Sequence, residues 1–108
     1  MANTFKLKTK ANVGVTTTAV YVATGSTTTV VIGITASNIS GNNINVGIGI
    51  TRASADDIHL MKNVQIPQGS SFEFMQGNKI VLETTDTITA KSDVQNSLDI
   101  ALTIMEIT

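Results

Sequence analysis

Residues 27–53 read TTTVVIGITASNISGNNINVGIGITRA, two alternating apolar runs on either side of a polar segment. Successive side chains of a β-strand point to opposite faces, so each run builds one apolar face. The face of the first run consists of Val30, Ile32, Ile34 and Ala36. The face of the second run consists of Ile44, Val46, Ile48 and Ile50. We predict two strands here, joined as a β-hairpin by the Asn, Ser and Gly residues of 38–43.

Three glycines occupy the opposite face of this predicted hairpin. Gly33 belongs to the first run, and Gly47 and Gly49 belong to the second. A glycine inside a strand removes side-chain bulk and often marks a bulge or a close approach of another backbone. We therefore expect something to pack near these positions.

The rest of the chain has the same character, because turn residues recur at the spacing of about 8 to 12 residues that is typical of all-β folds. The last strand is predicted at 98–107, with Leu98, Ile100, Leu102 and Ile104 on one face and Glu106 where that face should continue. No stretch has the pattern of a helix. We predict one all-β domain over residues 1–108, an antiparallel β-sandwich of about eight strands, either Ig-like or jelly-roll-like.

Composition excludes several classes of function. The formal net charge is −1, so no overall field attracts nucleic acid or an anionic membrane. The sequence contains no Cys, which removes thiolate catalysis and Cys-based zinc sites. No apolar run approaches the roughly 18 residues of a membrane span. We predict neither a nucleic-acid partner nor a membrane partner.

The residues that could support catalysis are few. Asp56, Asp57 and His59 form the one cluster with metal-ligand chemistry, but further ligands for a closed zinc site are missing nearby. The spacing of the other carboxylates, which include Glu83, Asp86 and Glu106, selects no acid/base pair, so we interpret them as residues of solvated faces and turns. The sequence thus predicts no catalytic residues, no metal site and no cofactor, and we expect the protein not to be an enzyme.

At the start of the chain, Lys6, Lys8 and Lys10 alternate with Phe5 and Leu7. A strand over these residues would carry three ammonium groups on one face. Lysines commonly protect an edge strand against unwanted pairing, and we predict such an edge here. The other interpretation is an arm that docks on an acidic partner.

Several segments together resemble a known kind of protein. They are the strand AVYVA at 19–23, the strand TTTVVIGITASN at 27–38, the segment IPQGSSFEFMQGNKIVLETTDTITAKS at 66–92 and the closing strand SLDIALTIMEI at 97–107. In these features the chain resembles the short all-β virion structural proteins of tailed bacteriophages. The resemblance implies a subunit of a virion, as a capsid decoration protein or as part of the neck, tail or fibre.

From this resemblance we expect a non-enzymatic virion subunit that packs as a homo-oligomer and contacts other capsid or tail proteins. The predicted interface lies on the second faces of the outer strands and on the lysine face, and comprises Lys6, Lys8, Lys10, Ala19, Tyr21, Val31, Met61, Met105 and Ile107. The alternative is a receptor- or glycan-binding module of a tail fibre. That alternative predicts a shallow pocket in which Asn and Asp residues converge on Tyr21 or His59.

Overall fold

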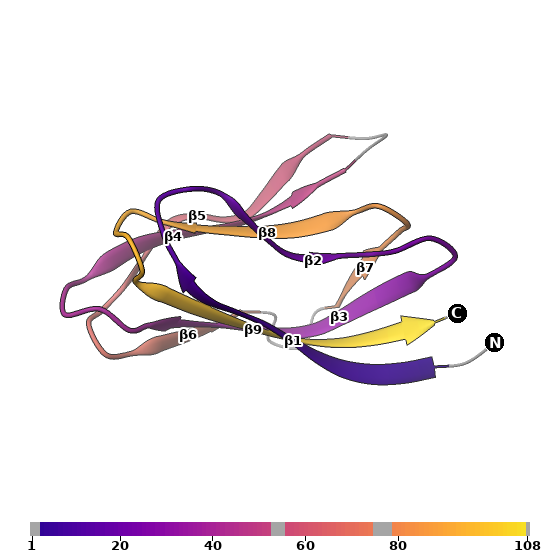
Figure 1. Ribbon diagram of the computed structural model, residues 1–108, viewed down its shortest axis with the longest axis horizontal. Coiled ribbons are helices and arrows are strands. Elements are labelled where there is room, and N and C mark those ends of the chain that lie inside the picture. The colour runs from indigo at the N-terminus through magenta and orange to yellow at the C-terminus, as the bar shows by residue number, and fades with distance from the viewer. Residues whose placement is uncertain (1–2, 53–55, 75–78, 108) are drawn as a thin grey trace.

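The computed structural model describes residues 3–52, 56–74 and 79–107, with the side chain of Phe74 left aside, as two stacked layers of strands (Figure 1). Sheet A contains β1 (Asn3–Val13), β9 (Leu98–Ile107), β3 (Thr28–Asn38), β6 (Ser71–Phe74) and β7 (Ile80–Leu82). Sheet B contains β2 (Thr18–Val22), β8 (Thr87–Ser92), β4 (Ile44–Thr51) and β5 (Ile58–Ile66). All the pairings are antiparallel. The predicted all-β sandwich is confirmed.

The strand order is that of a jelly roll. Sheet A runs β1-β9-β3-β6, with β7 also paired to β3, and sheet B runs β2-β8-β4-β5. β6 and β7 lie one after the other along the same edge of β3, so the nine strand segments of the described residues occupy eight positions. Consecutive strands mostly alternate between the sheets, which favours the jelly-roll alternative over the Ig-like one.

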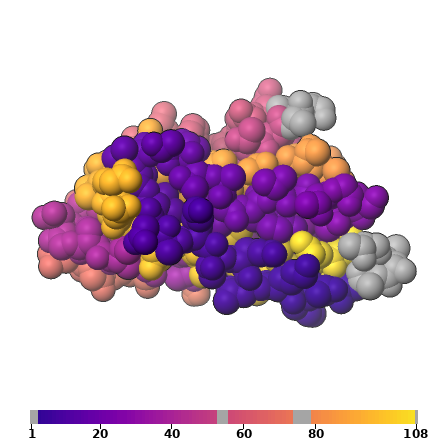
Figure 2. All heavy atoms as spheres, viewed as in Figure 1, coloured from indigo at the N-terminus to yellow at the C-terminus, as the bar shows by residue number. Residues whose placement is uncertain are grey.

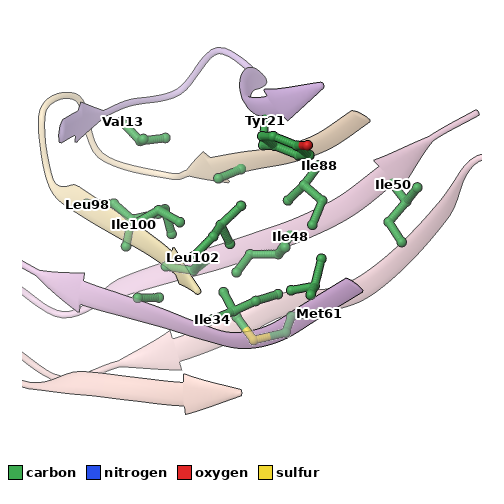
Figure 3. Close-up of a cluster of buried hydrophobic side chains, with 14 of the residues drawn as sticks. Val13, Tyr21, Ile34, Ile48, Ile50, Met61, Ile88, Leu98, Ile100 and Leu102 are labelled. Atoms are coloured by element: carbon green, nitrogen blue, oxygen red, sulfur yellow. The ribbon is translucent and has the colours of Figure 1, made fainter. Parts of the chain in front are cut away.

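A continuous apolar core fills the space between the sheets, and Figure 3 shows side chains of both layers meeting there. Sheet B contributes the predicted face of β4, because Ile44, Val46, Ile48 and Ile50 are all buried. Sheet A contributes the predicted face of β9, because Leu98, Ile100, Leu102 and Ile104 are buried as well. These two predicted faces are confirmed.

The predicted β-hairpin over residues 27–53 is wrong. β3 belongs to sheet A and β4 to sheet B, so residues 39–43 carry the chain from one layer to the other. Asn38 fixes this crossing, since its Nδ2 donates to the carbonyls of Asn42 at 2.8 Å and Ile66 at 3.0 Å. Its Oδ1 accepts hydrogen bonds from the backbone N–H and the hydroxyl of Ser40. The hairpin partner of β4 is instead β5.

Bulges change the inward face of three strands. The pairing registers leave one extra residue at Val20 in β2 and at Ile32 in β3. They leave two in β5, one at Leu60 and one where Lys62 and Asn63 together oppose Gly47. An extra residue reverses the alternation of side chains beyond it. In β3 the buried side chains are therefore Thr29 and Val31 before the bulge, and Ile34, Ala36 and Asn38 after it. The predicted inward orientation of Val30 and Ile32 is wrong for this reason.

Candidate functional site

Three of the nine predicted interface residues lie inside the molecule. Tyr21, Val31 and Met61 are buried in the core of the sandwich, and Figure 3 shows Tyr21 and Met61 among the other core side chains. Each is next in sequence to one of the bulged residues Val20, Ile32 and Leu60. The prediction that they lie on an outer face is wrong, because it assumes strict alternation of side chains and takes no account of the extra residue.

Met105 and Ile107 do lie on the outer face of sheet A. Met105 is opposite Phe5 on one side and Val30 on the other, and Val30 is opposite Val81. Directly opposed residues of antiparallel strands share a face. These four residues therefore form a row across β1, β9, β3 and β7, which we call the apolar row. Phe5 is 70% exposed and Val81 is 58% exposed.

The lysines of β1 lie on the other side of that strand. Lys6, Lys8 and Lys10 are opposite Ile104, Leu102 and Ile100, so they line the border of the core, and Phe5 and Leu7 face outward. β1 is the edge strand of sheet A, as predicted. Figure 2 shows its indigo atoms at the surface, beside the yellow end of β9. Ala19 is exposed on the outer face of sheet B, opposite Thr89.

A polar cluster closes the core at one end of β9. The Tyr21 hydroxyl lies 2.7 Å from Thr29 Oγ1 and donates to Glu106 Oε2 at 2.7 Å. Lys6 Nζ lies 2.8 Å from Glu106 Oε1. The pKa of Glu106 is lowered. The hydrogen bond from Lys6 is the largest cause, and the hydrogen bond from Tyr21 is the second largest. The pKa of Tyr21 is raised, mainly by burial and secondly by the hydrogen bond to Glu106. These contacts stabilise the negative charge of Glu106 at the position where the apolar face of β9 ends.

A second polar cluster gathers two of the carboxylates considered above. Arg52 Nε donates to Asp86 Oδ1 at 3.2 Å and Oδ2 at 3.1 Å, and Arg52 Nη2 lies 3.2 Å from Glu83 Oε2. Asp86 Oδ2 also accepts a hydrogen bond from the backbone N–H of Glu83. These contacts fasten the turn between β7 and β8 to the end of β4. The buried Asp86 carboxylate therefore accepts hydrogen bonds that stabilise the fold.

The outer face of sheet B carries a groove of about 470 Å³. Its floor is the central strand β4, where Gly47 and Gly49 present no side chains. On the β8 side, Lys91 is opposite Gly47 and Thr89 is opposite Gly49. On the β5 side, His59 is opposite Gly49, and a bulge places Lys62 and Asn63 opposite Gly47. Two glycines between larger neighbours thus form a trough along β4.

Carboxylates stand at the two ends of this trough, and both have hydrogen-bond donors within the chain. At one end, Asp93 accepts from the backbone N–H of Asn45 at 2.9 Å and from its Nδ2 at 3.3 Å. At the other, Asp57 Oδ1 accepts from the backbone N–H of Arg52 at 2.9 Å. The glycan-binding alternative expects a pocket around Tyr21 or His59, and His59 lines this groove. Tyr21 lies in the core instead.

Sequence reasoning missed Lys62 and Lys91 as groove residues. The signal available was the pair of glycines at alternate positions of β4, which was expected to mark a close approach. That expectation is confirmed at Gly49, where an added Cβ would lie 2.8 Å from the carbonyl oxygen of Ile58. Within residues 3–52, 56–74 and 79–107, no three His, Cys, Asp or Glu side chains gather as metal ligands. The same ranges contain no helix that is long and apolar enough to cross a membrane.

The fold of this chain is similar to that of a solved structure. No protein-family model matches the chain, and neither does any curated protein. A solved structure from Bacillus endospore appendages, described as a novel family of disulfide-linked pili, is similar with a TM-score of 0.59. The similarity covers 99% of this chain and 87% of that one, at 13% sequence identity. At this identity the similarity concerns the fold.

Proposed function

We propose that this protein is a non-enzymatic structural subunit of a virion that assembles with copies of itself through the apolar row on sheet A. The observation that carries the proposal is the position of Phe5 and Val81 at opposite ends of that row, both largely exposed. Leu7, 66% exposed, extends the apolar surface along β1. An exposed apolar patch of this kind is typical of a protein–protein contact.

A second copy of the chain suits this surface. The row crosses four strands without a charged side chain, so an identical row on another subunit is complementary to it. The sequence contains no cysteine, so contacts between copies through its own residues involve no disulfide. The similar appendage structure is described as a pilus, and a subunit of a repeating particle is consistent with that description.

Sedimentation velocity over a range of concentrations tests the assembly. We expect the wild-type protein to form oligomers, and the double variant Phe5→Thr/Leu7→Thr to remain monomeric at concentrations at least about tenfold higher. Threonine keeps the preference for strand structure and removes the apolar surface.

The matched control is Ile39→Thr, because Ile39 is also exposed but lies in the segment between the sheets. This control should assemble like wild type. A wild-type protein that stays monomeric up to the solubility limit would contradict the assembly. So would a double variant that assembles as well as wild type.

The location of the subunit is tested on particles from a lysate in which the chain is produced. Antibody–gold labelling of intact virions should mark the heads for a decoration protein, or the neck and tail for an appendage. Mass spectrometry of the same purified particles supplies an independent readout for an inaccessible position. Absence of the chain from both measurements would overturn the virion role and leave the assembly surface to be explained otherwise.

A further inference from the structure

We propose that the groove on the outer face of sheet B binds an acidic saccharide whose anionic group lies over Gly47, between Lys62 and Lys91. This site is on the sheet opposite the apolar row, so the inference goes beyond the proposed assembly and does not depend on it. The residues that carry it are those opposite the two glycines of β4.

The two lysines flank the same glycine of β4. Lys91 is opposite Gly47 on β8, and the bulge that contains Lys62 is opposite Gly47 on β5. Two strand spacings place the flanking backbones about 10 Å apart, a gap that two lysine side chains span with room for one anionic group. Within the described parts of the chain, neither ammonium group belongs to an ion pair. Two like charges face one groove there without a counter-charge between them.

The charged side chains of the groove alternate in sign along β4. From Asn45 to Thr51 the groove presents Asp93 at one end, then the two lysines, then His59 with Thr89, and then Asp57 at the other end. The span is about 20 Å at the usual rise of a strand. A polymer with closely spaced negative charges would meet a carboxylate at each end. A chain with one anionic group between neutral, hydroxyl-bearing units would donate hydrogen bonds to those carboxylates instead.

The groove is less suited to a peptide or a nucleic acid than to a saccharide. β4 is hydrogen-bonded to β8 on one side and to β5 on the other, so its backbone offers no free edge to an extended peptide. The groove is lined mainly by hydroxyl, amide and charged side chains, and His59 is the one ring among the residues around it. Stacking platforms for nucleic-acid bases are therefore missing from this lining. Hydroxyl and amide groups are suited to a saccharide.

Isothermal titration calorimetry with four probes tests the site. Hyaluronan oligosaccharides alternate a carboxylated sugar with a neutral one, heparin oligosaccharides are densely sulfated, chitin oligosaccharides are neutral, and poly-glutamate is an acidic peptide. We expect hyaluronan oligosaccharides to bind at least about tenfold more tightly than each of the other three. Tighter binding of the neutral saccharide or of poly-glutamate would overturn the proposed ligand class. Tighter binding of heparin would overturn the argument from the end carboxylates.

Variants then locate the contact. Lys62→Gln and Lys91→Gln should each weaken binding of the hyaluronan probe by about tenfold, and the double variant should abolish it. Lys10→Gln removes the same charge from β1 and should leave binding unchanged. Equal weakening by Lys10→Gln would show non-specific attraction and overturn the site, as would wild-type binding by the double variant. A wild-type protein that binds none of the probes at millimolar concentration also overturns it.

Filling the floor gives a test that does not alter charge. An added Cβ at Gly47 would lie 3.5 Å from the carbonyl oxygen of Met61, an ordinary contact, so Gly47→Thr should fold and occupy the groove. We expect loss of hyaluronan binding with an unchanged circular dichroism spectrum and unchanged sedimentation. Retained binding would overturn the location. Because the apolar row is untouched, this variant separates a failure of the saccharide site from a failure of the assembly.

Discussion

The hydroxyl of Tyr21 donates to a carboxylate oxygen of Glu106 at 2.7 Å, and this hydrogen bond joins β2 of sheet B to β9 of sheet A. Tyr21 is turned inward by the bulge at Val20, and Glu106 follows the last apolar residue on the inward face of β9. The same hydroxyl contacts Thr29 of β3, and Lys6 of β1 contacts the other carboxylate oxygen. Four strands thus meet at one polar cluster that ends the core.

Tyr21→Phe tests the strength of this junction. The substitution keeps the ring in the core and removes the hydroxyl, so the buried Thr29 hydroxyl loses the partner that it has in the wild-type protein. We expect the free energy of unfolding to fall by about 1–2 kcal/mol. Urea denaturation followed by circular dichroism measures the change. Thr103→Val removes an exposed hydroxyl of β9 and should change stability by less than about 0.5 kcal/mol; equal effects of the two variants would contradict the role of the cluster.

Acid should weaken the same cluster. Lys6 and Tyr21 lower the pKa of Glu106 in the folded protein, so folding favours its charged form. This contribution is complete above the unfolded pKa of about 4.3 and is lost as the pH falls through the lower folded value. Between about pH 6 and pH 3, wild type should therefore lose more stability than Glu106→Gln does. Urea midpoints at both pH values measure the difference, and parallel losses would show that Glu106 contributes nothing to it.

Asn38 should be essential to the crossing between the sheets. Asn38→Ala removes two hydrogen bonds donated to the Asn42 and Ile66 carbonyls and the acceptor for Ser40. We expect a loss of about 2–4 kcal/mol, because these partners lie partly or wholly out of water. Thermal denaturation measures it, with the exposed Asn3→Ala as control. A change below about 0.5 kcal/mol would mean that the loop at 39–43 holds its course without Asn38.

Gly49 should tolerate no side chain. An added Cβ would lie 2.8 Å from the carbonyl oxygen of Ile58, a backbone atom that cannot rotate away. We expect Gly49→Ala to destabilise the protein by about 1–3 kcal/mol. Gly33→Ala is the matched control in β3, since nothing lies within 4 Å of its added Cβ. Similar denaturation midpoints for the two variants would contradict the close approach of β5 to β4.

The regular strands were predictable from the sequence, and the irregular ones were not. β4 and β9 keep a period of two through their apolar residues, and both predicted faces are confirmed. The faces around Tyr21, Val31 and Met61 were predicted wrongly, since each of these residues lies beside an extra residue whose position only the pairing with the neighbouring strand defines. For an apolar residue beside a bulge, the sequence alone does not distinguish the inward face of the strand from the outward face.

The crossing between the sheets could not be predicted from neighbouring residues, for a different reason. Residues 38–43 have the turn chemistry of a hairpin, but the side chain of Asn38 bonds to Ile66, a residue 28 positions away. The groove shows the same limit. Gly47 and Gly49 were visible in the sequence, but Lys62, Lys91 and His59 reach them from two strands that the sequence does not assign as neighbours.

The place of β9 also determines the order in which the fold is completed. β9 lies between β1 and β3 in sheet A, although those two strands leave the ribosome long before it. Until β9 has been synthesised, the facing edges of β1 and β3 have no strand to pair with, and the core lacks Leu98, Ile100, Leu102 and Ile104. Pairing over such a sequence distance is slow, so the nascent chain exposes open strand edges until β9 has emerged. Lysines discourage unwanted strand pairing, so we expect those of β1 to protect that strand during this interval.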